Sequence, residues 1–254
     1  GTGGLVGSRT RAVMIGGRDS PVNECVIDFV TIASTGNSTD FGDVTNGVAN
    51  SGQGNNTVRG VAYSGSRNNP SPAITNTIDF ITIAQQGDAV DFGDAVTACV
   101  TQTGGLNSPT RGIFAGGYIN SPSATFYNII QYITISSSGG ASDFGDLIDG
   151  NYRPPGLSDS TRGIFGGGFT NNPANWSKTD QLQYVTIAST GDASDFGDLT
   201  PEKLVNAGGC ASPTRGLFGG GMIHPLVTDL IDYVTIQTKG NAKDFGNLTV
   251  KREE

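Results

Sequence analysis

One phrase recurs five times along this chain of 254 residues. It reads SDSTRGIFGGG at 158–168, SPTRGLFGGG at 212–221 and SPTRGIFAGG at 108–117, with weaker copies NTVRGVAYSG at 56–65 and RTRAVMIGG at 9–17. The arginines of the five copies are separated by 48, 52, 51 and 53 residues, and they are Arg11, Arg59, Arg111, Arg162 and Arg215. A repeat of this length is typical of a propeller, a solenoid or a linear array.

A second phrase follows each copy of the first, as in QYVTIASTGDASDFGDLT at 183–200. β-Branched and aromatic residues dominate it, which favours strands, and the chain shows no apolar spacing of three and four residues over several turns. Each second phrase contains an Asp-Phe-Gly triplet, and the triplets begin at Asp40, Asp91, Asp143, Asp195 and Asp244. Each repeat therefore predicts four short strands.

Four strands in every 51 residues or so make one propeller blade. The predicted fold is all-β, a five-bladed β-propeller with four antiparallel strands per blade. The whole chain, 1–254, is expected to form a single domain, with blades at approximately 1–47, 48–97, 98–149, 150–200 and 201–254.

The spacing across the two ends of the chain matches the spacing between repeats. Leu199 lies nine residues before Gly208, and counting from Leu248 through Glu254 and onward from Gly1 reaches Gly3 after nine residues. This register predicts that the termini meet and that the fifth blade joins the first.

The arginine near the second strand, the following glycine pair and the aromatic residue of the third strand resemble a kelch-type propeller blade from Gly3 to Thr249. Kelch blades usually carry Trp on the fourth strand, whereas this chain carries Phe, at Phe41, Phe92, Phe144, Phe196 and Phe245. The combined wording TRGIFGGG and YVTIASTGDASDFGDLT is similar to repeats of structural and tail-fibre-like proteins of bacteriophages, marine ones especially. That resemblance implies a virion or extracellular location.

The composition of the chain excludes some classes of binding partner. Charged residues make up 15% of the chain and the net charge is −8, which argues against nucleic acid or an anionic membrane face as the partner, because a polyanion site needs clustered Lys and Arg. The sequence has no transmembrane run, so no membrane insertion is expected. Cys25, Cys99 and Cys210 are odd in number and scattered, so no disulfide framework is expected. No cofactor or metal is expected either.

The repeated arginines and Asp-Phe-Gly aspartates are expected to be structural. One Arg and one Asp per blade would pair within or between blades, because a site used once per molecule has no reason to appear five times. The alternative is a ring of arginines that lines the central channel and binds an anion.

The loops between the glycine pair and the third strand differ between repeats, and loops on a rigid scaffold are where recognition usually resides. Aromatic rings beside amide groups suit sugars. The candidate ligand-binding residues are Trp176, Phe169, Tyr118, Phe126, Tyr127, His224, Asn171 and Asn172. The alternative is that these aromatics hold the loops onto the blades. We expect one or two sites, in the neighbouring loops 118–128 and 169–181.

These observations predict a non-enzymatic recognition or adhesion module, such as a phage tail-fibre or receptor-binding propeller. The expected partner is a surface glycan or another host envelope component, with other virion or fibre proteins possible. The alternative is a structural platform for protein-protein interaction. A glycoside hydrolase is less favoured, because the acids follow the repeat and His224 is the only histidine.

Overall fold

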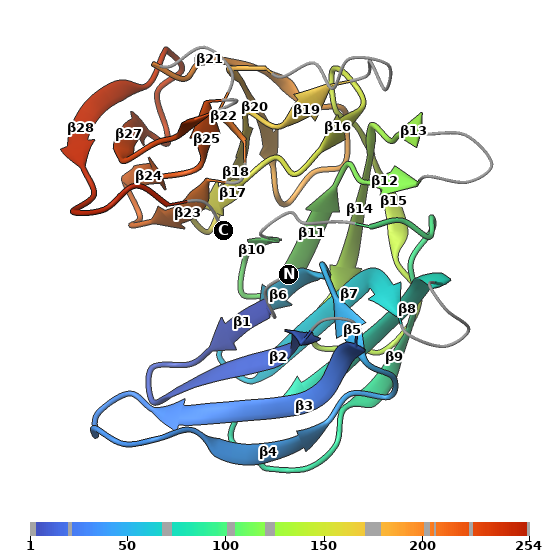
Figure 1. Ribbon diagram of the computed structural model, residues 1–254. Helices are drawn as coiled ribbons and strands as arrows, with labels where there is room; N and C mark the ends of the chain where they lie inside the picture. The colour runs from blue at the N-terminus through green and yellow to red at the C-terminus, as the bar shows by residue number, and fades with distance from the viewer. Residues whose placement is uncertain are drawn as a thin grey trace.

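The computed structural model describes residues 4–19, 22–67, 73–100, 105–119, 125–170, 179–200, 204–205, 207–223 and 226–252. Five antiparallel four-stranded sheets are arranged as a five-bladed β-propeller, as the sequence predicts. The five sheets follow one another round the molecule in chain order, from blade 1 in blue to blade 5 in red (Figure 1).

Each blade is formed by one continuous stretch of chain. Blade 1 contains β1 (Gly4–Gly7), β2 (Arg11–Asp19), β3 (Val22–Thr31) and β4 (Thr39–Asp43). Blade 2 contains β6 (Gly52–Asn55), β7 (Arg59–Arg67), β8 (Ala73–Thr82) and β9 (Val90–Asp94). Blade 3 contains β10 (Leu106–Asn107), β11 (Arg111–Ala115), β14 (Ile129–Thr134) and β15 (Ser142–Asp146). Blade 4 contains β17 (Gly156–Ser158), β18 (Arg162–Gly166), β20 (Gln181–Thr186) and β21 (Ser194–Asp198). Blade 5 contains β23 (Gly208–Ala211), β24 (Arg215–Gly219), β27 (Leu230–Thr235) and β28 (Lys243–Asn247).

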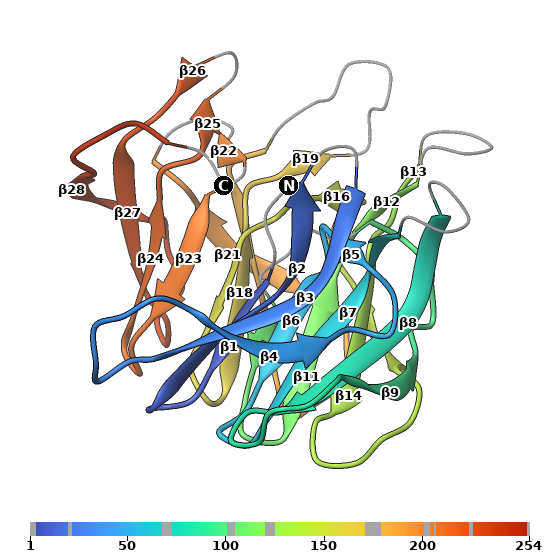
Figure 2. The ribbon, with the colours of Figure 1, turned by 60° about the horizontal axis from the view of Figure 1, so that its bottom comes forward.

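Short extra strands gather at one end of the propeller (Figure 2). They are β5 (Val48–Ala49), β12 (Tyr118–Ile119), β13 (Thr125–Phe126), β16 (Asn151–Tyr152), β19 (Phe169–Thr170), β22 (Leu204–Val205), β25 (Met222–Ile223) and β26 (Leu226–Val227). They flank the variable loops or belong to the connections between blades, and pairs such as β16 with β19 tie the two together. We call this end the loop end.

The glycine pair of the first phrase ends the straight part of each second strand. Gly116 and Gly167 adopt φ values of 71° and 63°, a left-handed conformation that side chains rarely accept. A Cβ on Gly116 would lie 2.3 Å from the carbonyl oxygen of Asn151. Asn151 belongs to the connection that leads from blade 3 to blade 4, and this connection passes close to Gly116. In blade 2, Ser64 takes the same position with a φ of 53°.

The hydrophobic cores lie between the blades rather than within them. One buried cluster joins blade 1 to blade 2, and the equivalent clusters join blade 2 to 3, 3 to 4 and 4 to 5. In the third of these, Leu106 and Phe144 of blade 3 pack with Ile187 of blade 4. We call each such set of contacts a joint. Fully burying one side chain of this size contributes about 1.5–3 kcal/mol, so the joints hold most of the stabilising apolar contact.

Hydrogen bonds repeat at every joint that is formed. A backbone N–H at the turn before the fourth strand donates to the carbonyl oxygen of the preceding blade's Asp-Phe-Gly phenylalanine; Gly191 donates to Phe144 over 2.7 Å. The equivalent pairs are Gly87 with Phe41, Gly139 with Phe92 and Gly240 with Phe196, at 2.7–2.8 Å. The two backbones lie close together at these bonds: a Cβ placed on Gly197 would be only 2.5 Å from Gly240.

The predicted joint between blade 5 and blade 1 is not formed among the described residues. Ile32 of blade 1 is 56% exposed and Phe245 of blade 5 is 51% exposed, whereas their counterparts at the other four joints are at most 3% exposed. A Cβ placed on Gly246 would meet nothing within 4 Å, whereas one on its counterparts Gly42, Gly93, Gly145 or Gly197 would lie 2.5–2.6 Å from the next blade. The register that matches across the termini therefore does not close the ring by itself. We call this unformed joint the open seam.

Candidate functional site

An aromatic cluster lies at the loop end of blades 3 and 4, where the described parts of their variable loops begin and end. Phe126, Tyr152 and Phe169 are buried, with Tyr118 packed against them. Ring centroids are 5.2 Å apart for Tyr118 and Tyr152 and 6.2 Å apart for Tyr152 and Phe169. The pairing of β12 with β13 and of β16 with β19 sets these rings side by side. The bases of loops 118–128 and 169–181 are therefore neighbours, as the sequence predicts.

The predicted ligand-binding aromatics divide into two groups by burial. Phe126 and Phe169 are buried, so they hold the loops to the blades instead of offering a face to a ligand. Tyr118 and Tyr127 are half-buried and keep part of their surface accessible. Trp176, His224, Asn171 and Asn172 lie outside the described residues.

Tyr152 joins the cluster although no sequence pattern selected it. It sits in the connection between blades 3 and 4, and the Arg153 guanidinium lies 5.1 Å from the centre of its ring. The aromatic residue in NYR at 151–153 has no equivalent in the other repeats, so the repeat alignment gave no signal for it.

The repeated arginines occupy the opposite end of the propeller from the loops, and they do not pair with the repeated aspartates as expected. Each guanidinium lies over the third-strand ring of its own blade, at 4.4–4.7 Å from the ring centre. Four of them also donate to an isoleucine carbonyl of the next blade, as Arg162 Nη1 does to Ile236 over 2.9 Å. The equivalent bonds run from Arg11 to Ile83, Arg59 to Ile135 and Arg111 to Ile187, at 2.9–3.1 Å.

The five Asp-Phe-Gly aspartates are exposed, so they are not buried partners of the arginines. Asp91 and Asp244 accept hydrogen bonds from the backbone N–H groups of Gly93 and Gly246 at 3.0 and 2.9 Å. The pairing with the third strand shifts by one residue opposite each triplet. Where these bonds form, the aspartate stabilises its own bulge, which is a local role.

A buried acceptor in the third strand was missed. Asp79, Gln131, Gln183 and Asp232 are buried at equivalent positions. Each accepts from the connection that leaves the preceding blade: Ile148 N–H donates to Gln183 over 2.7 Å, and Thr200 N–H donates to Asp232 over 2.9 Å. The sequence signal for this position was a residue that is Asp or Gln in every repeat, in VIDF, TIDF, IIQY, QLQY and LIDY.

A polar hollow of about 350 Å³ opens at the end away from the loops. Asn55, Asn107 and Ser158 line it, and they bond to one another round the axis: Asn55 N–H donates to Asn107, and Asn107 N–H donates to Ser158, each over 3.1 Å. Burial acts to raise the pKa of the neighbouring Asp159 carboxyl. Hydrogen bonds, led by those from the backbone of Arg162 and Thr161, outweigh it and hold the pKa below the ordinary value.

The chemistry of the described part of the chain offers few reactive groups. No three His, Cys, Asp or Glu side chains among these residues lie together as a metal site would require. Burial raises the pKa of the Cys99 thiol to about 12, which keeps it protonated. The pKa of Asp198 is raised by partial burial and by the nearby Asp180 and Asp195 carboxylates, but this group lies at the exposed outer edge of blade 4.

In the same described ranges, no helix is long and apolar enough to cross a membrane. No protein-family model matches the chain, and a search of curated proteins finds no similar sequence. The fold therefore defines the class, a five-bladed β-propeller, and function has to be argued from the residues.

Proposed function

We propose that this propeller is a non-enzymatic recognition module that binds a surface glycan at its loop end, between blades 3 and 4. The observation that carries the proposal is the aromatic cluster, which fixes the bases of the variable loops of blades 3 and 4 side by side. A rigid base lowers the entropy lost when loops order around a ligand. Half-buried Tyr118 and Tyr127 sit at this base.

The sugar class follows from side-chain types. Tyrosine and tryptophan rings stack on the C–H faces of sugars, and amide groups satisfy hydroxyls. The loop that follows β19 supplies Asn171, Asn172 and Trp176 from its sequence. The resemblance of the repeats to those of phage structural and tail-fibre-like proteins suits a host-binding role on a virion.

A glycan array tests the proposal. The 254-residue chain is expected to bind a defined set of sugars, and Trp176→Ala is expected to abolish that binding without changing the melting temperature. Phe245→Ala is the matched control, because it removes an exposed aromatic ring from the fourth strand of blade 5, outside the loops of blades 3 and 4. Equal losses in the two variants would contradict a site in the loops.

A structural platform for protein-protein interaction is the second candidate, and the open seam favours it. An apolar blade face left in contact with water usually marks an interaction site. Absence of sugar binding at millimolar concentration, together with tight binding to a virion protein, would support the platform instead.

A further inference from the structure

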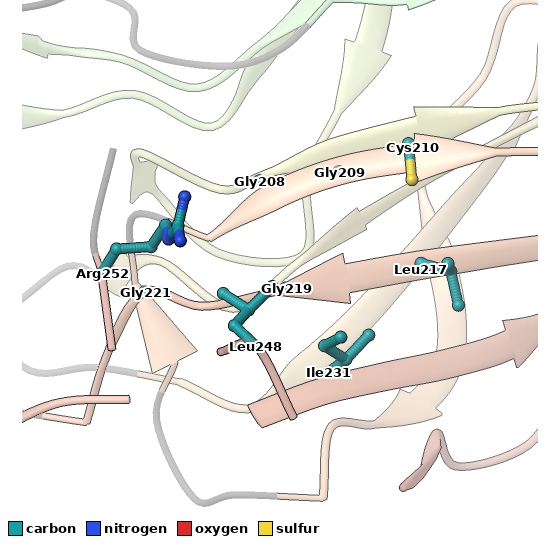
Figure 3. Close-up of a pocket in the computed structure, with 9 residues that line it drawn as sticks. All are labelled: Gly208, Gly209, Cys210, Leu217, Gly219, Gly221, Ile231, Leu248 and Arg252. Carbon is teal, nitrogen blue, oxygen red and sulfur yellow. The ribbon is translucent and has the colours of Figure 1, made fainter. Parts of the chain in front are cut away.

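The open seam consists of two apolar faces. On blade 5, Cys210, Leu217, Ile231 and Leu248 line a hollow of about 400 Å³ (Figure 3). On blade 1, Ile32 is the exposed counterpart of buried Ile83, Ile135, Ile187 and Ile236. These faces contain the same kinds of residue that form the four sealed joints.

The position of Cys210 shows what blade 5 lacks. Val6, Leu106 and Leu157 hold the equivalent place on their first strands, and each inserts against a second-strand glycine of the next blade. Leu157, for example, lies where a Cβ on Gly216 would be 2.4 Å from its Cδ1. All three are buried, whereas Cys210 is exposed.

The donor and the acceptor that would bond across the seam are also present, one on each blade. Arg215 lies over Tyr233 at 4.7 Å like the other repeated arginines, but in the described structure its guanidinium has no carbonyl acceptor. On the other side, the Ile32 carbonyl is the acceptor that such an arginine would use. Blade 5 thus carries the donor half of a joint and blade 1 carries the acceptor half.

The four formed joints repeat one set of contacts. They use the same bonds at nearly the same lengths, 2.9–3.1 Å for Arg to Ile and 2.7–2.8 Å for Gly to Phe. At the seam only the two halves of this set are present, because Ile32 and Phe245 are exposed. The chain after Leu248 already follows the path of a connection between blades, because the Arg252 carbonyl accepts from Gly221 N–H over 2.8 Å as the Asn151 carbonyl does from Gly117 N–H.

We propose that the open seam holds at least one further blade of the same repeat, covalently continuous with this chain. That blade offers an isoleucine carbonyl to Arg215 and an apolar strand-3 face to Cys210 and Leu217. It offers its own arginine to the Ile32 carbonyl. With that blade beside the five blades of this chain, both apolar faces of the seam are covered.

The test appends a copy of residues 206–254 after Glu254, which keeps the nine-residue spacing from Leu248 to the next first strand. The copy carries Cys210→Ser, so that a maleimide reports only on the original thiols. In the 254-residue chain, Cys210 is expected to react as fast as exposed Cys25. With the added blade, Cys210 is expected to react at least about tenfold more slowly while Cys25 is unchanged, because buried thiols are inert.

The control carries Ile236→Asp in the appended copy alone, which puts a charge into the new joint and is expected to restore the reactivity of Cys210. Circular dichroism and size-exclusion chromatography check that every chain is folded and monomeric. Three outcomes would overturn the proposal: no protection from the added blade, protection already complete in the 254-residue chain, or protection that rises with protein concentration. The second would mean that blade 1 seals the seam, and the third that a second copy does.

Discussion

Arg162 and Arg215 provide a matched pair that measures what one joint contributes. Both guanidinium groups lie over a tyrosine ring, at 4.6 and 4.7 Å. Arg162 also donates to the Ile236 carbonyl over 2.9 Å, while Arg215 faces the open seam. Replacing each by Leu keeps an apolar stem over the ring and removes the charge.

The magnitudes follow from the contacts. A hydrogen bond from a charged donor is worth about 1.5–3 kcal/mol, and a cation–π contact at a partly exposed site is worth about 0.5–1 kcal/mol. Arg162→Leu is therefore expected to lower the free energy of unfolding by about 2–4 kcal/mol, and Arg215→Leu by about 0.5–1 kcal/mol. For a domain of this size, the first change lowers the melting temperature by roughly 5–15 °C.

Urea denaturation followed by circular dichroism measures both variants against the unaltered chain. Equal large losses would show that Arg215 finds an acceptor in solution, which would refute the open seam. No loss at either position would show that the repeated guanidinium groups add no stability to the joints.

Three other residues give further predictions. Gly197→Ala is expected to destabilise the protein by about 1–3 kcal/mol more than Gly246→Ala in denaturant titrations. Both glycines have φ near 145°, but only the Gly197 Cβ would strike the next blade. Equal losses of stability would mean that backbone strain alone sets the cost of both substitutions. Cys99 is expected to resist thiol reagents at pH 8 until the protein unfolds, because its pKa is raised to about 12. Mass spectrometry after labelling of the native protein checks this, and modified Cys99 in the folded state would contradict it. The folded-state pKa of Asp159 lies below its unfolded value, so its contribution to the free energy of unfolding is complete above the ordinary pKa of 3.8 and is lost as pH falls through the lower folded value. Asp159→Asn should therefore flatten the acid side of a curve of stability against pH. An unchanged acid side would contradict the lowered pKa.

The blade architecture was predictable from the sequence because strand chemistry and turn glycines repeat in register. TRG, the glycine pair and DFG fix where strands begin, bend and end, and the all-β propeller with five four-stranded blades is confirmed. The neighbourhood of the two long loops was predictable too, since successive blades lie side by side.

The partners of the repeated polar groups were not predictable in the same way. Arg162 binds a backbone carbonyl, and every residue type carries one, so no pattern of side chains marks it. An equal count of arginines and aspartates suggested ion pairs, although the aspartates lie exposed on bulges. The open seam was hidden for a different reason: residue counts fix the length of a connection, but the rotation at each joint depends on packing.

The roles of the candidate aromatics could be only half predicted. Phe126, Phe169 and Tyr118 were recognised as belonging together, but their burial depends on Tyr152, which arrives from the blade connection. The same cluster that removes two rings from ligand contact gives the loops their fixed base.

The central functional claim is that the variable loops bind the ligand, rather than the repeated phrases. Isothermal titration calorimetry of the 254-residue chain with the best sugar from the array tests it most directly. One or two sites per chain are expected, in the adjacent loops of blades 3 and 4, with no measurable heat for Trp176→Ala. A stoichiometry near five, with Trp176→Ala removing only a fifth of the sites, would contradict it.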